Sequence, residues 1–113
     1  MALINKEQFL QNTACEHKDV HIEELGGEIR IKAMSIADQI KFEEESVNAK
    51  NQDDLIFQLI LNCCVDENNK KLFSKEDIEA IKERAAPIII KLFQEILKVN
   101  KLDEAEIDKL AKN

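Results

Sequence analysis

The only two glycines of the chain are adjacent, at Gly26 and Gly27, and its one proline is Pro87. Glycine and proline are the residues that most often interrupt regular secondary structure. A chain of 113 residues with only three of them has room for few tight turns. We therefore expect a fold that is rich in helices.

The glycine pair separates two short runs in which apolar and polar residues alternate. Val20 and Ile22 precede the pair, and Ile29 and Ile31 follow it. Alternation on both sides of Gly-Gly predicts a β-hairpin with one apolar face, with both glycines in the turn, where a positive φ is needed. Because an isolated hairpin is marginally stable in water, this face is expected to pack on the rest of the chain.

Helix start signals divide the remaining sequence. Four residues that can cap a helix are each followed three positions later by a residue that can complete the cap: Asn5 with Gln8, Ser35 with Asp38, Ser74 with Asp77, and Asp103 with Glu106. Pro87 suits the first turn of a further helix. In the helix after Ser35, the apolar stripe is expected to be Ile36, Ile40 and Val47.

The expected fold class is mainly α with a small N-terminal β-hairpin, an α+β chain with about five helices in a compact bundle. A length of 113 residues is typical of one domain. We expect residues 1–113 to form a single domain. Within it, residues 1–34 hold the N-terminal helix and the β-hairpin, and residues 35–113 form the helical part.

The charge balance argues against several classes of partner. The 23 acidic residues outnumber the 16 basic ones, for a net charge of −7, and the chain has neither Trp nor Tyr. This composition does not favour binding to nucleic acid. No apolar run approaches the ~20 residues of a membrane span, and Lys6 and Glu7 lie where a signal peptide would be apolar. The expected location is the cytoplasm, with no nucleic acid and no membrane as partner.

Two predicted helices, over residues 55–64 and 88–99, are apolar around most of their circumference. A surface helix normally has a single apolar stripe. These helices therefore either form an internal core or are covered by a second protein, through self-association or partner binding. The candidate partner contacts are Ile56, Leu59, Ile60, Ile89, Phe93 and Ile96. For each of them, an ordinary place in the core is the competing interpretation.

No pattern of residues predicts a catalytic site, a cofactor or a metal, and the chain is expected not to be an enzyme. Cys15, His17 and His21 lack a fourth zinc ligand at a matching spacing. Residues 66–77 match a calcium loop at three positions, but Lys70 replaces an oxygen ligand and Lys71 the turn glycine. The three cysteines are expected to be reduced thiols that pack as small apolar residues.

Several short segments occur in an order that resembles a known family. The N-terminal segment 6–10 reads Lys-Glu-Gln-Phe-Leu, and the hairpin segment 22–31 reads Ile-Glu-Glu-Leu-Gly-Gly-Glu-Ile-Arg-Ile. Residues 63–68, Cys-Cys-Val-Asp-Glu-Asn, precede residues 72–78, Leu-Phe-Ser-Lys-Glu-Asp-Ile. Leu92-Phe93 and Ile96-Leu97 follow, before Asn100 and Leu102. Over nearly its whole length, the chain resembles the tail assembly chaperones of long-tailed bacteriophages and prophages, except that Asn69-Lys70 stand where a Gly is expected.

The resemblance implies a non-enzymatic role in virion assembly in the bacterial host cytoplasm. Such chaperones bind the helix-rich tape measure protein and keep it soluble until tail tube protein polymerises around it. In many phages a programmed frameshift also yields a longer form. The alternative function is that of a small acidic cytosolic adaptor or inhibitor that binds a host or phage protein. A gene position between tail tube and tape measure genes would favour the chaperone.

Overall fold

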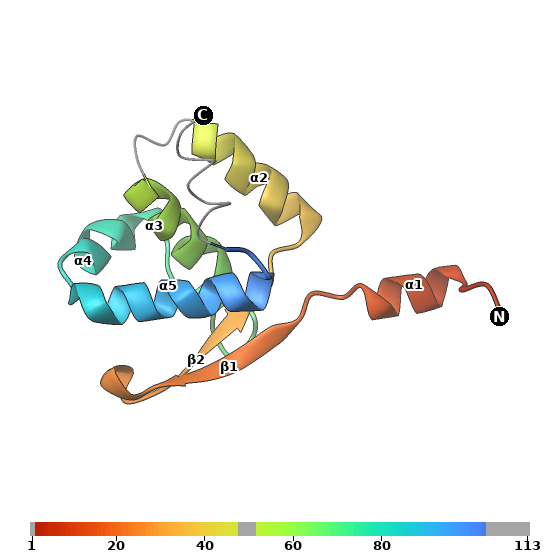
Figure 1. The fold of residues 1–113 in the computed structure, drawn as a ribbon, viewed down its shortest axis with the longest axis horizontal. Helices are drawn as coiled ribbons and strands as arrows, with labels where there is room; N and C mark the ends of the chain where they lie inside the picture. Colours follow the sequence, from red (N-terminus) through yellow and green to blue (C-terminus); the bar gives the residue numbers. More distant parts are fainter. Residues whose placement is uncertain (1, 48–51, 104–113) are drawn as a thin grey trace.

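The computed structural model describes residues 2–47 and 52–103. Its helices are α1 (Lys6–Asn12), α2 (Ile36–Val47), α3 (Gln52–Cys63), α4 (Ile78–Lys82) and α5 (Ala86–Asn100). Its strands are β1 (His17–Ile22), β2 (Gly27–Lys32) and β3 (Cys64–Val65), and two short 3-10 helices are η1 (Glu23–Leu25) and η2 (Lys75–Asp77). The predicted fold class, mainly α with a small N-terminal hairpin, is confirmed (Figure 1). The helix predicted after Asp103 lies outside the described residues.

The hairpin has the register that its sequence predicts. β1 and β2 pair in antiparallel fashion, with Val20 opposite Ile29. Val20, Ile22 and Ile31 are buried, and Ile29 packs against the same core. The turn consists of η1 and Gly26, which has a φ of 79°. Gly27 is the first residue of β2, so the expected positive φ is found at only one of the two glycines.

A third strand, β3, was not predicted. Cys64 and Val65 pair with Ile31 and Arg30, so the sheet has the order β1-β2-β3. Cys64 was expected to be the last residue of a helix, but α3 ends at Cys63. A strand of two residues has no periodicity of its own, and its conformation depends on the neighbouring strand β2.

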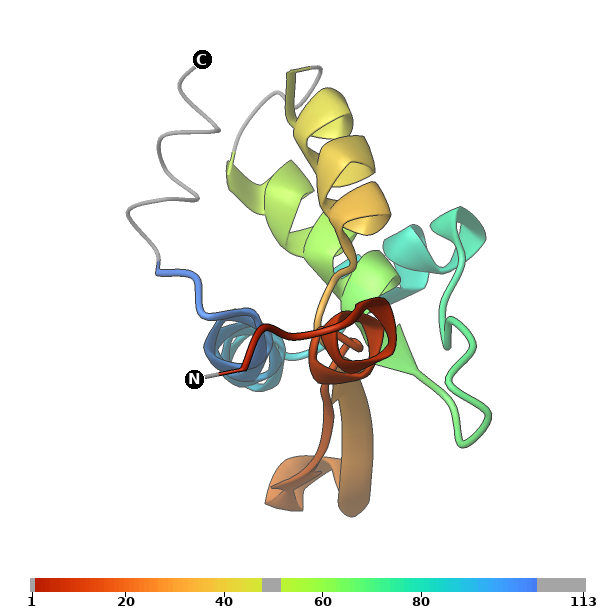
Figure 2. The ribbon, with the colours of Figure 1, turned by 90° about the vertical axis from the view of Figure 1, so that its right-hand side faces the viewer.

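The helices stack on the sheet in the order α5, α3, α2. α5 contacts both hairpin strands on one side and α3 on the other, and α3 in turn contacts α2 (Figures 1 and 2). Their shared core is made of buried residues from every layer: Ile22, Ile31, Phe42, Leu55, Leu59, Ile60, Cys63, Cys64, Leu92, Phe93, Ile96 and Leu97. The chain therefore covers most of both apolar helices with its own elements.

Helix α2 begins as predicted but buries a different side. Ser35 Oγ accepts a hydrogen bond from the Asp38 N–H, which is one half of the predicted cap. The expected stripe was wrong, because Ile36, Ile40 and Val47 are all exposed. Phe42 and Ser46, one helical turn apart, are the buried residues and face α3. Phe42 is 2% exposed and supplies the large apolar side chain with which α2 joins the core.

The side chain of Asn100 connects three separate parts of the fold. Its Oδ1 accepts a hydrogen bond of 2.8 Å from the Met34 N–H, just beyond β2. Its Nδ2 donates to the carbonyl of Ile96 at 3.0 Å and lies 3.6 Å from Cys63 Sγ at the end of α3. Asn100 therefore joins the end of α5 to β2 and α3 at the point where α5 ends.

Helix α1 lies apart from this packed body. None of its residues is buried, and Figure 1 shows it projecting away from the sheet and the other helices. Its start is fixed locally, because Asn5 and Gln8 form the reciprocal cap that the sequence predicts. No helix among the described residues is long and apolar enough to cross a membrane.

We expect Asn100→Ala to lower the free energy of unfolding by about 1–3 kcal/mol, because it leaves the partly buried Met34 N–H without its acceptor. Gln94→Ala, at an exposed position of the same helix, should change it by less than about 0.5 kcal/mol. Urea denaturation of the two variants compares these values. Equal losses would contradict a connecting role for Asn100.

The three cysteines should differ in reactivity. Cys15 is exposed, whereas Cys63 and Cys64 are buried, and burial raises the pKa of each buried thiol to about 12. A thiol reagent should therefore label only Cys15 in the native protein at pH 8 and all three residues in denaturant. Mass spectrometry counts the labels. Cys15→Ala should leave the native protein unlabelled, and rapid labelling of that variant would contradict the burial of the pair.

Candidate partner-binding groove

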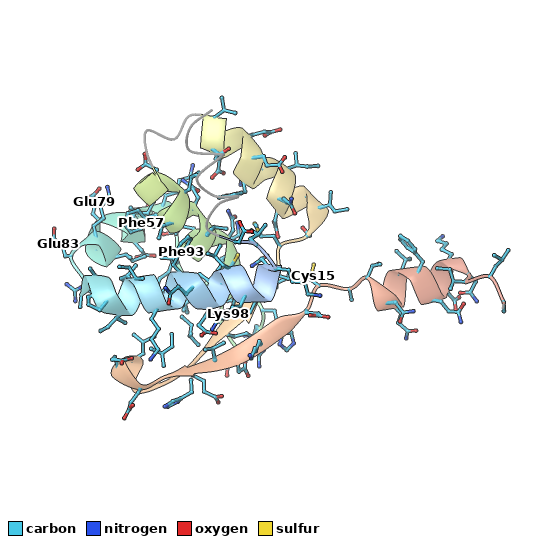
Figure 3. The ribbon with its side chains drawn as sticks, viewed as in Figure 1. Cys15, Phe57, Glu79, Glu83, Phe93 and Lys98 are labelled. Atoms are coloured by element: carbon cyan, nitrogen blue, oxygen red, sulfur yellow. The ribbon has the colours of Figure 1, made fainter. Side chains whose placement is uncertain are left out.

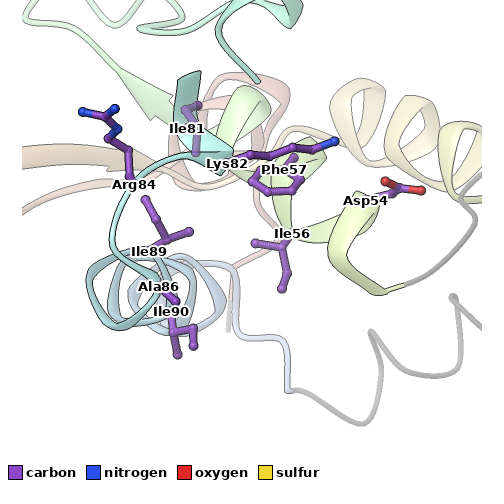
Figure 4. A pocket seen from close by; sticks show the side chains of 9 residues that line it. All are labelled: Asp54, Ile56, Phe57, Ile81, Lys82, Arg84, Ala86, Ile89 and Ile90. Atoms are coloured by element: carbon purple, nitrogen blue, oxygen red, sulfur yellow. The ribbon is translucent and has the colours of Figure 1, made fainter. Parts of the chain in front are cut away.

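A groove opens between α3, α4 and α5, on the side of these helices away from the sheet (Figure 4). Its volume is about 390 Å³. The residues that line it come from all three helices and the segment between α4 and α5: Asp54, Ile56, Phe57, Ile81, Lys82, Arg84, Ala86, Ile89 and Ile90. We call this feature the helix groove.

The helix groove has apolar walls and a charged rim. Ile56 and Phe57 contribute from α3, and Ile89 and the half-exposed Ile90 contribute from α5. Lys82 lies along Phe57, with its Nζ 5.6 Å from the centre of the ring. The Nζ is also 3.6 Å from Glu79 Oε1. Such a groove can receive apolar side chains while its rim contacts polar groups.

The six predicted partner contacts fall into two groups. Leu59, Ile60, Phe93 and Ile96 are all at most 4% exposed and lie in the core. Ile56 and Ile89 are half-buried, pack against that core and line the helix groove. Of the six, only Ile56 and Ile89 have side chains that a partner could contact in the isolated chain. One comes from α3 and the other from α5, and both line the same groove.

Sequence analysis missed most of the groove. Phe57, Lys82 and Arg84 line it but were not among the candidates. Of these three, only Phe57 could have been found from the sequence. It is next to Ile56 and lies off the i, i+4 series of buried residues on α3, which is Leu55, Leu59 and Cys63. The two basic residues have no sequence signal, because they reach the groove only through the packing of α4 beside α3.

A second apolar hollow lies on the hairpin side of α4 and α5, and we call it the hairpin-side hollow. Leu25, Ile29, Phe73 and Leu92 line it, and its volume is about 430 Å³. Ile81, Arg84 and Ile89 border both this hollow and the helix groove. Leu25, in the hairpin turn, is 50% exposed. The chain therefore has two neighbouring apolar depressions at the end of the body where α5 begins.

The segment compared with a calcium loop, residues 66–77, begins with a turn that its own side chains stabilise. Within the described residues, no three His, Cys, Asp or Glu side chains are grouped so that they could hold a metal ion. In segment 66–77, whose sequence argues against a calcium loop, Asp66 Oδ1 accepts hydrogen bonds from the N–H groups of Asn68 and Lys70. This carboxylate therefore stabilises its own turn.

The same turn shows how the chain can lack the Gly that is expected here in the family that its sequence resembles. Asn69 stands where a Gly is expected, and it adopts the left-handed conformation itself, with a φ of 62°. Asn is one of the few residues other than Gly that tolerates this conformation. Its side chain also accepts a hydrogen bond of 3.1 Å from Arg30, which ties the turn to the sheet.

The chain was compared with protein families, curated proteins and solved structures. No protein-family model matches it. No curated protein matches it either.

A solved structure, that of the bacteriophage HK97 tail assembly chaperone, does match. The TM-score is 0.55 and the sequence identity 19%, and the match covers 82% of this chain and 94% of the HK97 chain. At 19% identity, it is the structural match that shows a common fold. The chain thus shares the fold of the HK97 tail assembly chaperone, in agreement with the family that its sequence resembles.

Proposed function

We propose that the chain is a non-enzymatic tail assembly chaperone of a long-tailed phage or prophage, which acts in the bacterial host cytoplasm. In this proposal it binds the tape measure protein and keeps it soluble until tail tube protein polymerises around it. The observation that carries the proposal is the fold shared with the HK97 chaperone over most of both chains. The order of the sequence motifs supports the same family independently.

The helix groove is the proposed site for the tape measure protein. Apolar residues from three helices line one depression, which suits the apolar face of an amphipathic helix. Such a helix would place anchors one turn apart against Ile56, Phe57 and Ile89. Lys82 and Arg84 at the rim favour a bound helix that carries acidic residues beside its apolar stripe.

The predicted contact residues have two roles in this proposal. Ile56 and Ile89 contact the partner directly, because they are the two that line the groove. Leu59, Ile60, Phe93 and Ile96 hold α3 and α5 at the spacing that keeps the groove open. The net charge of −7 keeps the complex soluble by repulsion between copies.

Self-association is the second interaction expected from the sequence, and we assign it to a different part of the chain, the exposed helix α1. The helix groove is lined by α4 and by the first residues of α5, and α1 projects from the opposite end of the body (Figure 1). The two interactions can therefore be tested separately.

Co-expression with the tape measure protein of the same phage or prophage tests the proposed function. We expect the wild-type chain to raise the soluble yield of the tape measure protein, whereas Ile90→Asp and Lys82→Glu should abolish most of this gain. Both residues are exposed, so both variants should fold. A charge introduced into the apolar wall at Ile90 should weaken binding at least about tenfold.

The matched control is Ile36→Asp, which places the same charge on an isoleucine that is 79% exposed on α2, outside the groove. This variant should keep the full gain in soluble yield. Circular dichroism confirms that each variant is folded. A wild-type chain that does not change the soluble yield of the tape measure protein would overturn the proposed function, and equal effects of all three variants would overturn the assignment of the groove.

A further inference from the structure

The residues that follow Asp103 lie outside the described part of the chain, but their sequence is amphipathic. Residues 104–113 read Glu-Ala-Glu-Ile-Asp-Lys-Leu-Ala-Lys-Asn, and we call them the acidic segment. The predicted cap, Asp103 with Glu106, favours a helix here. In that helix Ile107, Leu110 and Ala111 share one face, because they are three and four positions apart.

The acidic segment carries its negative charges beside its apolar face. At about 100° per residue, Glu104 and Asp108 fall on one side of this face and Glu106 on the other. Lys109 and Lys112 fall on the side away from it. A helix of this length is marginal in water by itself. Its apolar face is therefore best stabilised by an apolar surface with a basic rim.

The acidic segment starts beside the last residues of both α3 and α5. Lys101 ends α5 in the left-handed conformation, with a φ of 56°, and the Leu102 N–H donates to the carbonyl of Leu97 at 2.9 Å. Leu102 packs against the core. At the same end of α5, Asn100 Nδ2 lies 3.6 Å from Cys63 Sγ, the last residue of α3.

From this point the helix groove is within reach of the segment. Phe57 lies six residues before Cys63 on α3, and Ile90 lies ten residues before Asn100 on α5. At ~1.5 Å per residue these separations are roughly 9 and 15 Å, and ten helical residues also span roughly 15 Å. Phe57 lies on the α4 side of Phe93, toward the beginning of α5 (Figure 3). A segment that runs back between α3 and α5 therefore reaches the groove.

The helix groove has a surface that complements the segment. Its apolar wall is formed by Ile56, Phe57, Ile89 and Ile90. Two basic residues, Lys82 and Arg84, and one acidic residue, Asp54, also line it. Because Lys82 Nζ is 5.6 Å from the centre of the Phe57 ring, a carboxylate at the edge of the wall meets this cation. The ion pair of Lys82 with Glu79 is exposed, and such pairs are weak enough to admit another carboxylate.

We propose that the acidic segment occupies the helix groove of its own chain, and that a helix of the tape measure protein displaces it. The inference rests on the proposed function, because it places a competitor in the groove that the tape measure protein binds. Ile107 and Leu110 pack against Ile56 and Phe57, and the acids beside them face Lys82. The segment thus has the chemistry that the groove favours in a partner helix.

Occupation by the segment regulates access to the groove. The apparent affinity for a partner falls with the fraction of chains in which the groove is open. Because the segment belongs to the same chain, this fraction does not depend on the concentration of the protein.

Thiol labelling of a groove residue tests the occupation in the full-length chain. Ile90→Cys in a Cys15→Ala background gives one accessible thiol, on the groove wall, because Cys63 and Cys64 are buried. We expect Leu110→Asp, added to this chain, to raise the labelling rate at least about threefold, because the new charge removes the segment from the apolar wall and opens the groove.

Ala105→Asp is the matched control, because it adds the same charge to the segment on the side opposite its apolar face. It should leave the labelling rate unchanged. A second control moves the thiol to Ile36→Cys, on α2 outside the groove, where Leu110→Asp should have no effect. Circular dichroism confirms that each variant is folded.

Binding to the tape measure protein of the same phage or prophage tests the displacement. The Leu110→Asp chain should bind at least about threefold more tightly than the wild type, because the apparent Kd is the intrinsic Kd divided by the open fraction. Ala105→Asp should bind as the wild type does.

Three results would overturn the inference, and they have different meanings. Equal labelling rates with and without Leu110→Asp show that the segment does not occupy the groove, and the effect of Ile90→Asp then decides the groove proposal by itself. Labelling that slows as the protein concentration rises places the segment of another copy in the groove. Faster labelling without tighter binding shows that the tape measure protein binds elsewhere, which overturns the assignment of the groove as well.

Discussion

The mutual burial of α3 and α5 is the constraint on which the rest of the structure depends. Both helices are apolar on most sides, and each needs cover from the few elements of a 113-residue chain. The hairpin covers α5, α2 covers α3 through Phe42, and the side chain of Asn100 joins the end of α5 to both α3 and β2. These elements bury the centre of the core, but they leave α1 and the sides of α3 and α5 beside α4 exposed.

The candidate site is a consequence of that incomplete cover. α4 has five residues and closes only part of the space between α3 and α5. Ile56, Phe57 and Ile89 are therefore left at the edge of the core, where they line the helix groove. The same residues that a larger domain would bury are here available to another protein. In the proposed function, the net charge of −7 makes copies of the chain repel one another while this surface binds an apolar partner.

The features that could be predicted from the sequence are those set by local interactions. The register of the hairpin follows from the alternation of Val20, Ile22, Ile29 and Ile31, and the start of α2 follows from the cap of Ser35 by Asp38. Features set by packing could not be predicted. β3 forms only because Cys64 and Val65 lie beside β2. The sequence could not separate Ile56 and Ile89 from the other four candidate contacts, because all six lie on apolar helices. Which of the six are covered depends on where α2, α4 and the sheet pack.

Amide hydrogen exchange of the chain, alone and in complex with the tape measure protein, tests the central claim most directly. If the helix groove holds the partner, the amides of α4 and of the first two turns of α5 should exchange more slowly in the complex, whereas those of β1 and of the exposed side of α2 should not change. Slower exchange confined to β1 or α2, with no change at α4 and α5, would contradict the account.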